Sequence, residues 1–248
     1  MIFARLPLEK LPPQTASSAG TGFLLGTGVI VTNVHVVATC TKETLDSIST
    51  ANKHVKFSRI IADGNRDLAL LVPVDNLTNG LELAAKDRPE PGTEVTTWGY
   101  PFLYNGASPL FSLGYVAGYR NEIKNNQTVK HIVVNGAFNH GNSGGPLLVA
   151  RSNEVIGIVV LTYNFYPPEI QNIIDDLQTH IAGFRYSVTR PDGSKQSLSD
   201  GQLAAIVLNE FYQKTQVMIG EAIAGSELRA MIKEHASELP ATSALTKK

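Results

Sequence analysis

The segment GNSGGPLL, from Gly141 to Leu148, sets one serine among small residues just before an apolar run. A serine nucleophile needs a tight loop that presents its hydroxyl, and backbone N–H groups that face the oxyanion formed when a carbonyl is attacked. Glycine permits the backbone angles that turn such N–H groups inward. Ser143 is therefore a candidate nucleophile, and the N–H groups of Gly141 and Ser143 are the candidate oxyanion hole.

A serine hydroxyl also needs a general base, because it is a poor nucleophile near neutral pH. His35 lies in TNVHVV, directly after the apolar segment GFLLGTGVIVT, and Asp67 begins the apolar part of NRDLALL. An aspartate can accept a hydrogen bond from the imidazole, which fixes its tautomer and stabilises the imidazolium. Each residue alone is ordinary at a strand end or turn, but the three together predict a His–Asp–Ser triad.

The chain order of these residues separates two kinds of hydrolase. GNSGG also fits the G-x-S-x-G turn of α/β hydrolases, but that fold places its acidic residue and histidine after the serine and alternates strands with helices. After Ser143 the chain offers Asp175 and His180, both in one predicted helix. An esterase on that fold is therefore disfavoured.

Short apolar runs separated by Gly, Pro, Asn or Asp fill the chain from about Ser17 to Val188, and GFRYSV is the expected last strand. This pattern is typical of β-sandwiches and barrels, and the lack of regular helix–strand alternation disfavours a parallel sheet. The charged, proline-containing AAKDRPEPGTE marks a junction between two halves, each long enough for a small barrel. The predicted fold is all-β with added helices: an N-terminal barrel over 1–88, a C-terminal barrel over 89–190 and a helical extension over 191–248.

Two helical regions are expected beside the strands. PPEIQNIIDDLQTHIAG places its isoleucines and leucine on one face, and the tail repeats apolar residues after a capping-box pattern from Ser199 to Gln202. Packing against the barrels is the simplest role for both faces. The alternative is that the C-terminal helices form a homo-oligomer interface or recruit a regulator.

Composition narrows the classes of partner. The chain has 21 Lys plus Arg against 22 Asp plus Glu, so no charge excess favours nucleic acid or an anionic membrane. No stretch approaches the roughly 20 apolar residues that span a bilayer. The single Cys40 cannot form an internal disulfide, and neither a metal nor a cofactor is expected. With no apolar signal-peptide core in MIFARLPLEKLPPQ, these features predict a cytoplasmic location.

The motifs together resemble those of the trypsin-like (chymotrypsin-fold) serine peptidases, and among them the high-temperature-requirement (HtrA) type of protease domain, without a PDZ domain. The resemblance runs from about Ala19 to Val188 and rests on GTGFLLGTGVIVTNVHVV, RDLALLVP, WGYP, LGYVAGYR and VNGAFNHGNSGGPLL. It implies two six-stranded antiparallel barrels with the site between them, and a serine endopeptidase that cleaves polypeptides through an acyl-enzyme. Asn142 stands where digestive relatives carry an aspartate, so activation by a newly freed N-terminus is not expected.

The same resemblance locates the S1 pocket, which receives the side chain before the scissile bond (P1). Its base falls at Ala137 and Phe138, and its wall at Val159, Val160 and Leu161. Neither base residue is acidic, so a basic side chain would lose hydration without gaining a counter-charge. We therefore expect small or medium apolar P1 residues.

The main alternative is a latent or non-catalytic module that keeps the peptidase fold to bind or regulate. Where many relatives carry a serine that supports the catalytic aspartate, this chain reads GIVVL around Val160. That difference leaves the orientation of Asp67 open. The helical segment after Tyr163 follows the substrate wall closely in the chain, and we hypothesise that it acts as a lid or an exosite.

Overall fold

The chain forms two compact units in a computed structural model. The structure describes residues 3–6, 20–45, 48–49, 53–101, 106, 108–136, 138, 141–160, 168–189, 193–214 and 219–240. One unit consists of Met1–Thr162 and Met218–Lys248, and the other of Tyr163–Val217. The larger unit carries all the candidate site residues.

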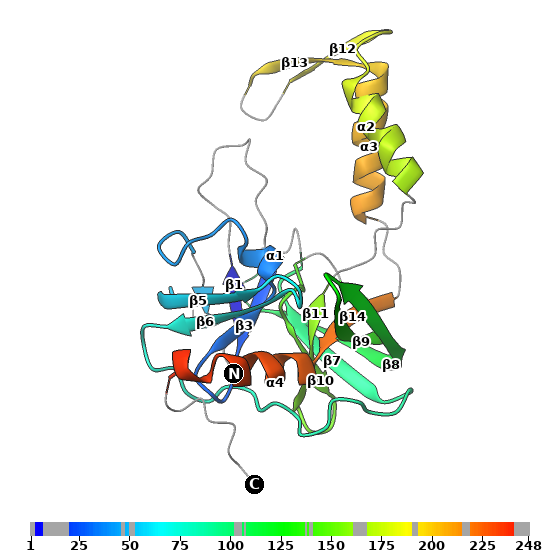
Figure 1. The fold of residues 1–248 in the computed structure, drawn as a ribbon. Coiled ribbons are helices and arrows are strands. Elements are labelled where there is room, and N and C mark those ends of the chain that lie inside the picture. The colour runs from blue at the N-terminus through cyan, green and yellow to red at the C-terminus, as the bar shows by residue number, and fades with distance from the viewer. Residues whose placement is uncertain are drawn as a thin grey trace. The chain divides into compact units, whose positions relative to one another are not determined.

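The first sheet of the larger unit has six strands in the order β4-β1-β2-β3-β6-β5 (Figure 1). Neighbouring strands pair antiparallel. The central strands β2, β3 and β6 are buried along their whole length, so apolar side chains from both of their faces enter the core. The strands are β1 Phe3–Leu6, β2 Gly20–Leu24, β3 Ile30–Thr32, β4 Ile48–Ser49, β5 Phe57–Asp63 and β6 Leu68–Pro73.

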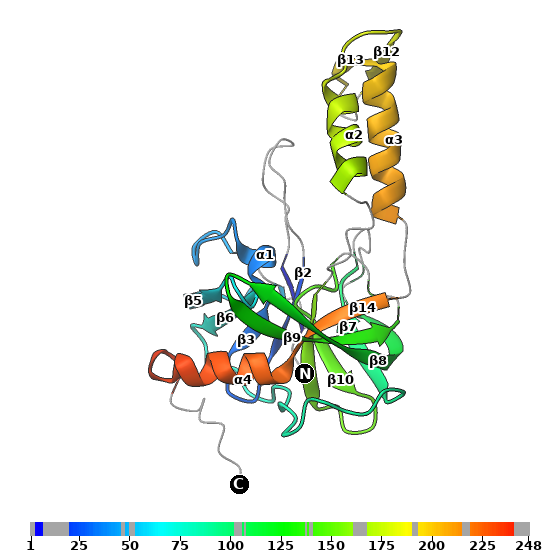
Figure 2. The same ribbon diagram turned by 45° about the vertical axis from the view of Figure 1, so that its right-hand side comes forward.

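The second sheet closes into a barrel in the order β10-β11-β14-β9-β8-β7. β8 and β9 form a long hairpin that ends at the pair Lys124 and Gln127, and β9 also pairs with β14 (Figure 2). The barrel strands are β7 Glu94–Gly99, β8 Leu110–Lys124, β9 Gln127–Asn135, β10 Pro146–Val149, β11 Val155–Val160 and β14 Ile219–Ala224. The prediction of a mostly β chain with added helices is confirmed. Of the two predicted barrels, the described strands show one closed barrel and one six-stranded sheet.

The last barrel strand differs from the prediction. GFRYSV is expected in that place, but β14 lies between β11 and β9, while β12 (Arg185–Thr189) pairs with β13 (Lys195–Ser199) in a separate two-stranded sheet. The assignment of GFRYSV is wrong because apolar alternation does not reveal burial: every residue of β12 is exposed. β14 was missed because a glutamate, Glu221, interrupts its short apolar pattern, in a region where only helices are expected.

The predicted helices are present. They are α2 Pro168–Thr179, α3 Asp200–Lys214 and α4 Gly225–Glu234, followed by the 3₁₀ turn Ala236–Glu238. The short helix α1 Val34–Val37 was not predicted: the sequence places His35 at the end of a strand, whereas the strand ends at Thr32. The predicted capping box precedes α3: Gln202 N–H donates to Ser199 Oγ at 3.2 Å, and Ser199 N–H donates to Gln202 Oε1 at 3.0 Å. Among the described residues, no helix is long and apolar enough to cross a membrane.

Helix α4 ties the two sheets of the larger unit together. Leu228, Met231 and Ile232 are spaced so that they share one helical face, and all three are buried. They belong to the same apolar cluster as Leu70 of β6 and Ile158 of β11. The C-terminal segment is therefore part of the core of this unit.

Candidate active site

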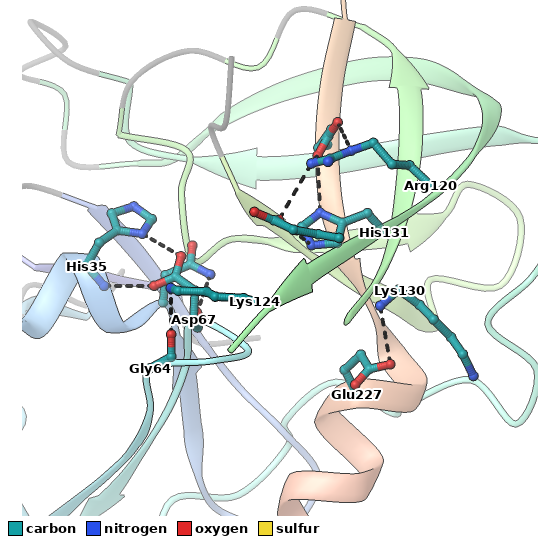
Figure 3. Close-up of polar contacts among 11 residues, drawn as sticks. His35, Gly64, Asp67, Arg120, Lys124, Lys130, His131 and Glu227 are labelled. Atoms are coloured by element: carbon teal, nitrogen blue, oxygen red, sulfur yellow. Dashed lines mark hydrogen bonds and ion pairs between the residues drawn. The ribbon is translucent and has the colours of Figure 1, made fainter. Parts of the chain in front are cut away.

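Two hydrogen bonds join His35 and Asp67 (Figure 3). His35 Nδ1 lies 2.7 Å from Asp67 Oδ2, and the His35 backbone N–H donates to Asp67 Oδ1 at 3.0 Å. A carboxylate at Nδ1 favours the tautomer that carries its proton there, which leaves the Nε2 lone pair available as a base. The geometry suits general-base chemistry.

Asp67 also holds the helix that carries His35. The Asp67 carbonyl oxygen accepts hydrogen bonds from the Val34 N–H at 3.3 Å and from Asn33 Nδ2 at 2.9 Å. Asn33, at the N-cap position of α1, makes no side-chain cap to its own helix. Asp67 therefore supplies acceptors for the first N–H groups of α1, and its φ of 55° is a left-handed conformation that Asp tolerates better than most residues.

Ser143 lies in the loop between β9 and β10, which is bonded to β11. Gly144 N–H donates to Val159 O at 2.9 Å, Val159 N–H donates to Gly145 O at 2.8 Å, and Gly145 N–H donates to Asn142 O at 2.9 Å. The N–H groups of Gly144 and Gly145 are therefore engaged within the protein. Ser143 itself is only 5% exposed, whereas the sequence argument calls for a loop that presents the hydroxyl.

The Ser143 loop is also bonded to β2 of the first sheet. Thr21 N–H donates to Ser143 O at 2.8 Å, and Thr21 Oγ1 donates to Gly141 O at 2.7 Å while accepting the Tyr100 N–H at 3.0 Å. Thr32 Oγ1 donates to Thr21 O at 2.8 Å. Thr21 therefore links the two sheets at the candidate nucleophile, a role that the sequence prediction missed; its signal is a polar residue in an apolar strand.

Close backbone packing brings the Ser143 loop to the first residues of β2. A Cβ at Gly144, whose φ is 84°, would lie 2.1 Å from Thr21 O, so only glycine fits there. A Cβ at Gly20 would lie 2.5 Å from Val36 Cγ2 and 3.0 Å from Ser143 O. The start of β2 therefore lies between the helix of His35 and the loop of Ser143, and brings the two together.

The predicted pocket residues are only partly described. Ala137 and Leu161 lie outside the described residues. Phe138 is buried against β14: a Cβ at Gly220 would lie 2.2 Å from Phe138 Cδ2. Val159 and Val160 are buried in β11, directly beside β14.

A charged cluster that the sequence did not reveal lies next to Gly220. The Glu221 side chain is fully buried, accepts two hydrogen bonds from Arg120 at 2.8 and 2.6 Å, and lies 3.1 Å from His131 Nδ1. Figure 3 labels Arg120 and His131 of this cluster. Burial alone would raise the pKa of Glu221, but the bonds from His131 and Arg120 outweigh burial and hold it below its usual value. Glu122 contacts the other ring nitrogen of His131 at 3.3 Å. The buried negative charge is therefore compensated within the barrel.

Within the described part of the chain, no group of three or more His, Cys, Asp or Glu side chains is placed to hold a metal ion.

Comparison with known proteins matches this chain to a protein family. The family model of the trypsin-like peptidase domain matches residues 20–158. A probable periplasmic serine endoprotease (DegP-like) of Hahella chejuensis is 34% identical over 159 residues, which cover 61% of this chain and 31% of that protein. The putative serine protease HhoB of Synechocystis is 28% identical over 249 residues, which cover 90% of this chain and 57% of that protein. The chain thus spans from about a third to just over half of these relatives' length.

Solved structures show the same fold. The active form of the Rv3671c protease from M. tuberculosis superposes with a TM-score of 0.58 at 18% identity, covering 94% of this chain and 78% of that chain. The inactive form of the Rv3671c protease gives a TM-score of 0.57 at 16% identity, covering 94% and 87%. At these identities the match concerns the fold alone.

The relatives contradict the predicted cytoplasmic location. Several of them are named as periplasmic serine endoproteases. The argument from cysteine content was too weak to decide, because a chain with one cysteine forms no internal disulfide in either compartment.

Thr21→Val should loosen the Ser143 loop, because it removes a buried hydroxyl while keeping the shape of the side chain. Gly141 O and the Tyr100 N–H then lose their partner, and we expect the free energy of unfolding to fall by about 1–3 kcal/mol. Thr93→Val is the matched control, since Thr93 Oγ1 bonds Glu90 O at an exposed site. Urea denaturation measures both; an equal, small effect of the two substitutions would contradict the role of Thr21.

Proposed function

The chain belongs to the trypsin-like peptidase family, and from this we propose that it is a serine endopeptidase whose catalytic residues are His35, Asp67 and Ser143. The observation that carries the proposal is the paired hydrogen bonding of Asp67 to the ring and backbone of His35. Ser143 lies in a loop bonded to the strand that packs against the helix of His35. A non-catalytic module is not favoured, because all three residue types are present.

In the proposed mechanism, His35 Nε2 takes the proton from Ser143 Oγ as that oxygen attacks the scissile carbonyl. Asp67, bonded to Nδ1, keeps the ring oriented and stabilises the imidazolium. His35 then donates the proton to the leaving amine, and water hydrolyses the acyl-enzyme in the second half of the cycle. The N–H groups of Gly141 and Ser143 are the proposed oxyanion donors, in keeping with the engagement of the Gly144 and Gly145 N–H groups elsewhere.

We also propose that the first sheet corresponds to the first barrel of the chymotrypsin-like fold. A junction near residue 88 agrees with the end of β6 at Pro73 and the start of β7 at Glu94. The names of the relatives support a periplasmic or secreted location.

For P1, the proposed preference is a small or medium apolar side chain. Phe138 is buried against Gly220, and its ring would fill much of a pocket at this position. The nearby Glu221 carboxylate is already bonded to Arg120 and His131, so it is not free to attract a basic P1 residue. A basic side chain would again be desolvated without compensation.

Ser143→Ala should abolish cleavage of casein and of a peptide library, lowering kcat/KM roughly 10⁴- to 10⁶-fold, since loss of the nucleophile removes the acyl-enzyme route. Ser58→Ala is the matched control, because Ser58 bonds Val72 O in the first sheet, away from the site. Cleavage by the alanine variant at the wild-type rate, or none by folded wild-type protein, would refute the proposal.

Phe138→Ala and Phe138→Leu should widen P1 acceptance in graded fashion. One methylene group in an apolar pocket changes the discrimination between two substrates by about 10- to 200-fold. We therefore expect the ratio of kcat/KM for P1 Phe over P1 Ala to rise at least several-fold in Phe138→Ala, and less in Phe138→Leu. The leucine variant guards against loss of folding from the larger cavity. An unchanged P1 profile in both folded variants would place the pocket elsewhere.

The unit Tyr163–Val217 is the proposed surface for a second copy of the chain. It leaves large apolar side chains exposed, namely Ile181, Phe184, Tyr186, Val188, Ile206 and Val207. Exposed apolar groups gathered on so small a unit are typical of interaction sites. Helix α4, by contrast, is occupied by the core of the larger unit.

Sedimentation over a range of protein concentrations tests this surface. We expect self-association in the wild-type chain, and weaker association in Phe184→Ser, because Phe184 is 80% exposed and its loss should not disturb folding. A monomer at every concentration would contradict self-association and leave a regulator as the remaining partner.

A further inference from the structure

The turn Asp63–Asp67 orients the carboxylate that holds His35, and it is built with local strain. Asp63 Oδ1 accepts the N–H groups of Asn65 at 2.9 Å and Arg66 at 3.2 Å, which closes the turn. Asp67 then takes a positive φ of 55°. A non-glycine residue keeps such a conformation when its surroundings hold it there.

Arg66, next to Asp67, points to the C-terminal helix α4. Its guanidinium forms a two-pronged pair with Glu234, with Nη1–Oε2 and Nη2–Oε1 both at 2.7 Å, although these residues are far apart in the chain. Arg66 Nη1 also donates to Asp63 Oδ2 at 2.6 Å, and Nε lies 3.5 Å from Glu227 Oε2. Such bidentate geometry fixes orientation as well as distance.

Arg66 is too enclosed for an ordinary surface ion pair. Its side chain is 11% exposed, and three carboxylates surround it. Hydrogen bonds to Glu234 and Asp63 outweigh burial and raise its pKa above its usual value, so the group stays charged. Removal of one partner from such a cluster leaves charges without compensation, unlike loss of an exposed pair.

The closed barrel holds the same turn from another side. Lys124 Nζ donates to Gly64 O at 2.7 Å (Figure 3). Asn125 Nδ2 donates to Asn65 Oδ1 at 2.8 Å, and Asn65 Nδ2 donates to Gln127 Oε1 at 3.1 Å. The tip of the β8–β9 hairpin and helix α4 thus both form polar contacts with the turn that carries Asp67.

Helix α4 is itself fixed to the barrel at this point. Glu227 Oε1 accepts the Lys130 backbone N–H at 3.4 Å (Figure 3). The other oxygen of Glu227 lies 3.5 Å from Arg66 Nε. A chain of contacts therefore runs from β9 through Glu227 to Arg66 and the Asp67 turn.

We propose that Arg66 is a positioning residue, which through Glu234 of the C-terminal helix holds Asp67 where it can fix the His35 imidazole. The inference rests on the proposed function, since His35 and Asp67 are there the base and its orienting group. It makes catalysis depend on a helix that carries none of the proposed catalytic residues.

Arg66→Ala, Arg66→Lys and Glu234→Gln test the proposal in the full chain. The control is Arg59→Ala, which breaks the exposed pair with Glu238 at 3.2 Å, another link between the first sheet and the C-terminal segment, away from the Asp67 turn. Ring-nitrogen NMR of ¹⁵N-labelled protein reports the His35 tautomer, with the His35 signals assigned through His35→Gln. Peptide kinetics give kcat and KM, and thermal unfolding checks the fold.

We expect Arg66→Ala to shift His35 from the single Nδ1–H tautomer toward a mixture, and to lower kcat about 10- to 100-fold with little change in KM, as for a misplaced catalytic group. Glu234→Gln should behave similarly but more weakly, Arg66→Lys should recover part of kcat, and Arg59→Ala should match wild type. Should Arg66→Ala fail to fold, Glu234→Gln carries the test.

The positioning role would be overturned if the His35 ring-nitrogen signals of folded Arg66→Ala and Glu234→Gln matched those of the wild type. A loss of stability with kcat unchanged would overturn it as well. The two proposals fail separately. A wild-type protein inert toward peptides would refute the endopeptidase assignment, whereas the tautomer measurement reads the effect of Arg66 on His35 without turnover.

Discussion

The hydrogen bonds between Thr21 and the Ser143 loop are the constraint on which the candidate site depends. Ser143 comes from one sheet and His35 from the other, so neither sheet alone can bring the two residues together. Strand β2 does this by bonding the Ser143 loop through Thr21 while packing its first residue against the helix of His35. The requirement for glycine at residues 20 and 144 follows from the same close approach.

One part of this candidate site, the pairing of His35 with Asp67, was predictable from local pattern. The serine in GNSGG and the histidine after an apolar hairpin carry chemical requirements that few other sequences meet, and the capping box before α3 is a short-range signal that the structure reproduces. Contacts between distant residues were not predictable. Arg66 and Glu234 are separated by most of the chain, and no periodicity in one segment encodes a partner in another.

The errors have physical causes. β14 was not predicted because a glutamate in a sequence normally indicates an exposed position. Glu221 is buried because Arg120 and His131, distant in the chain, compensate its charge. β12 was assigned to the barrel because alternation identifies a strand but not the sheet that it joins. The predicted location rested on the first residues of the chain and on a cysteine content that fits either compartment, and the names of the relatives carried the information instead.

The segment between β11 and β14 has a consequence for folding and for evolution. These strands are neighbours in the barrel, yet the whole unit Tyr163–Val217 lies between them in the chain. Lengthening a flexible connection costs only about 0.6 kcal/mol for each doubling, so a barrel can accept such an addition at a hairpin with little loss of stability. The barrel cannot close during synthesis until β14 has emerged, however, whereas the first sheet's strands are complete by Pro73. A ribosome-bound chain should therefore spend a long interval with the strands of the first sheet complete, while the barrel lacks its final strand and the shared core lacks helix α4.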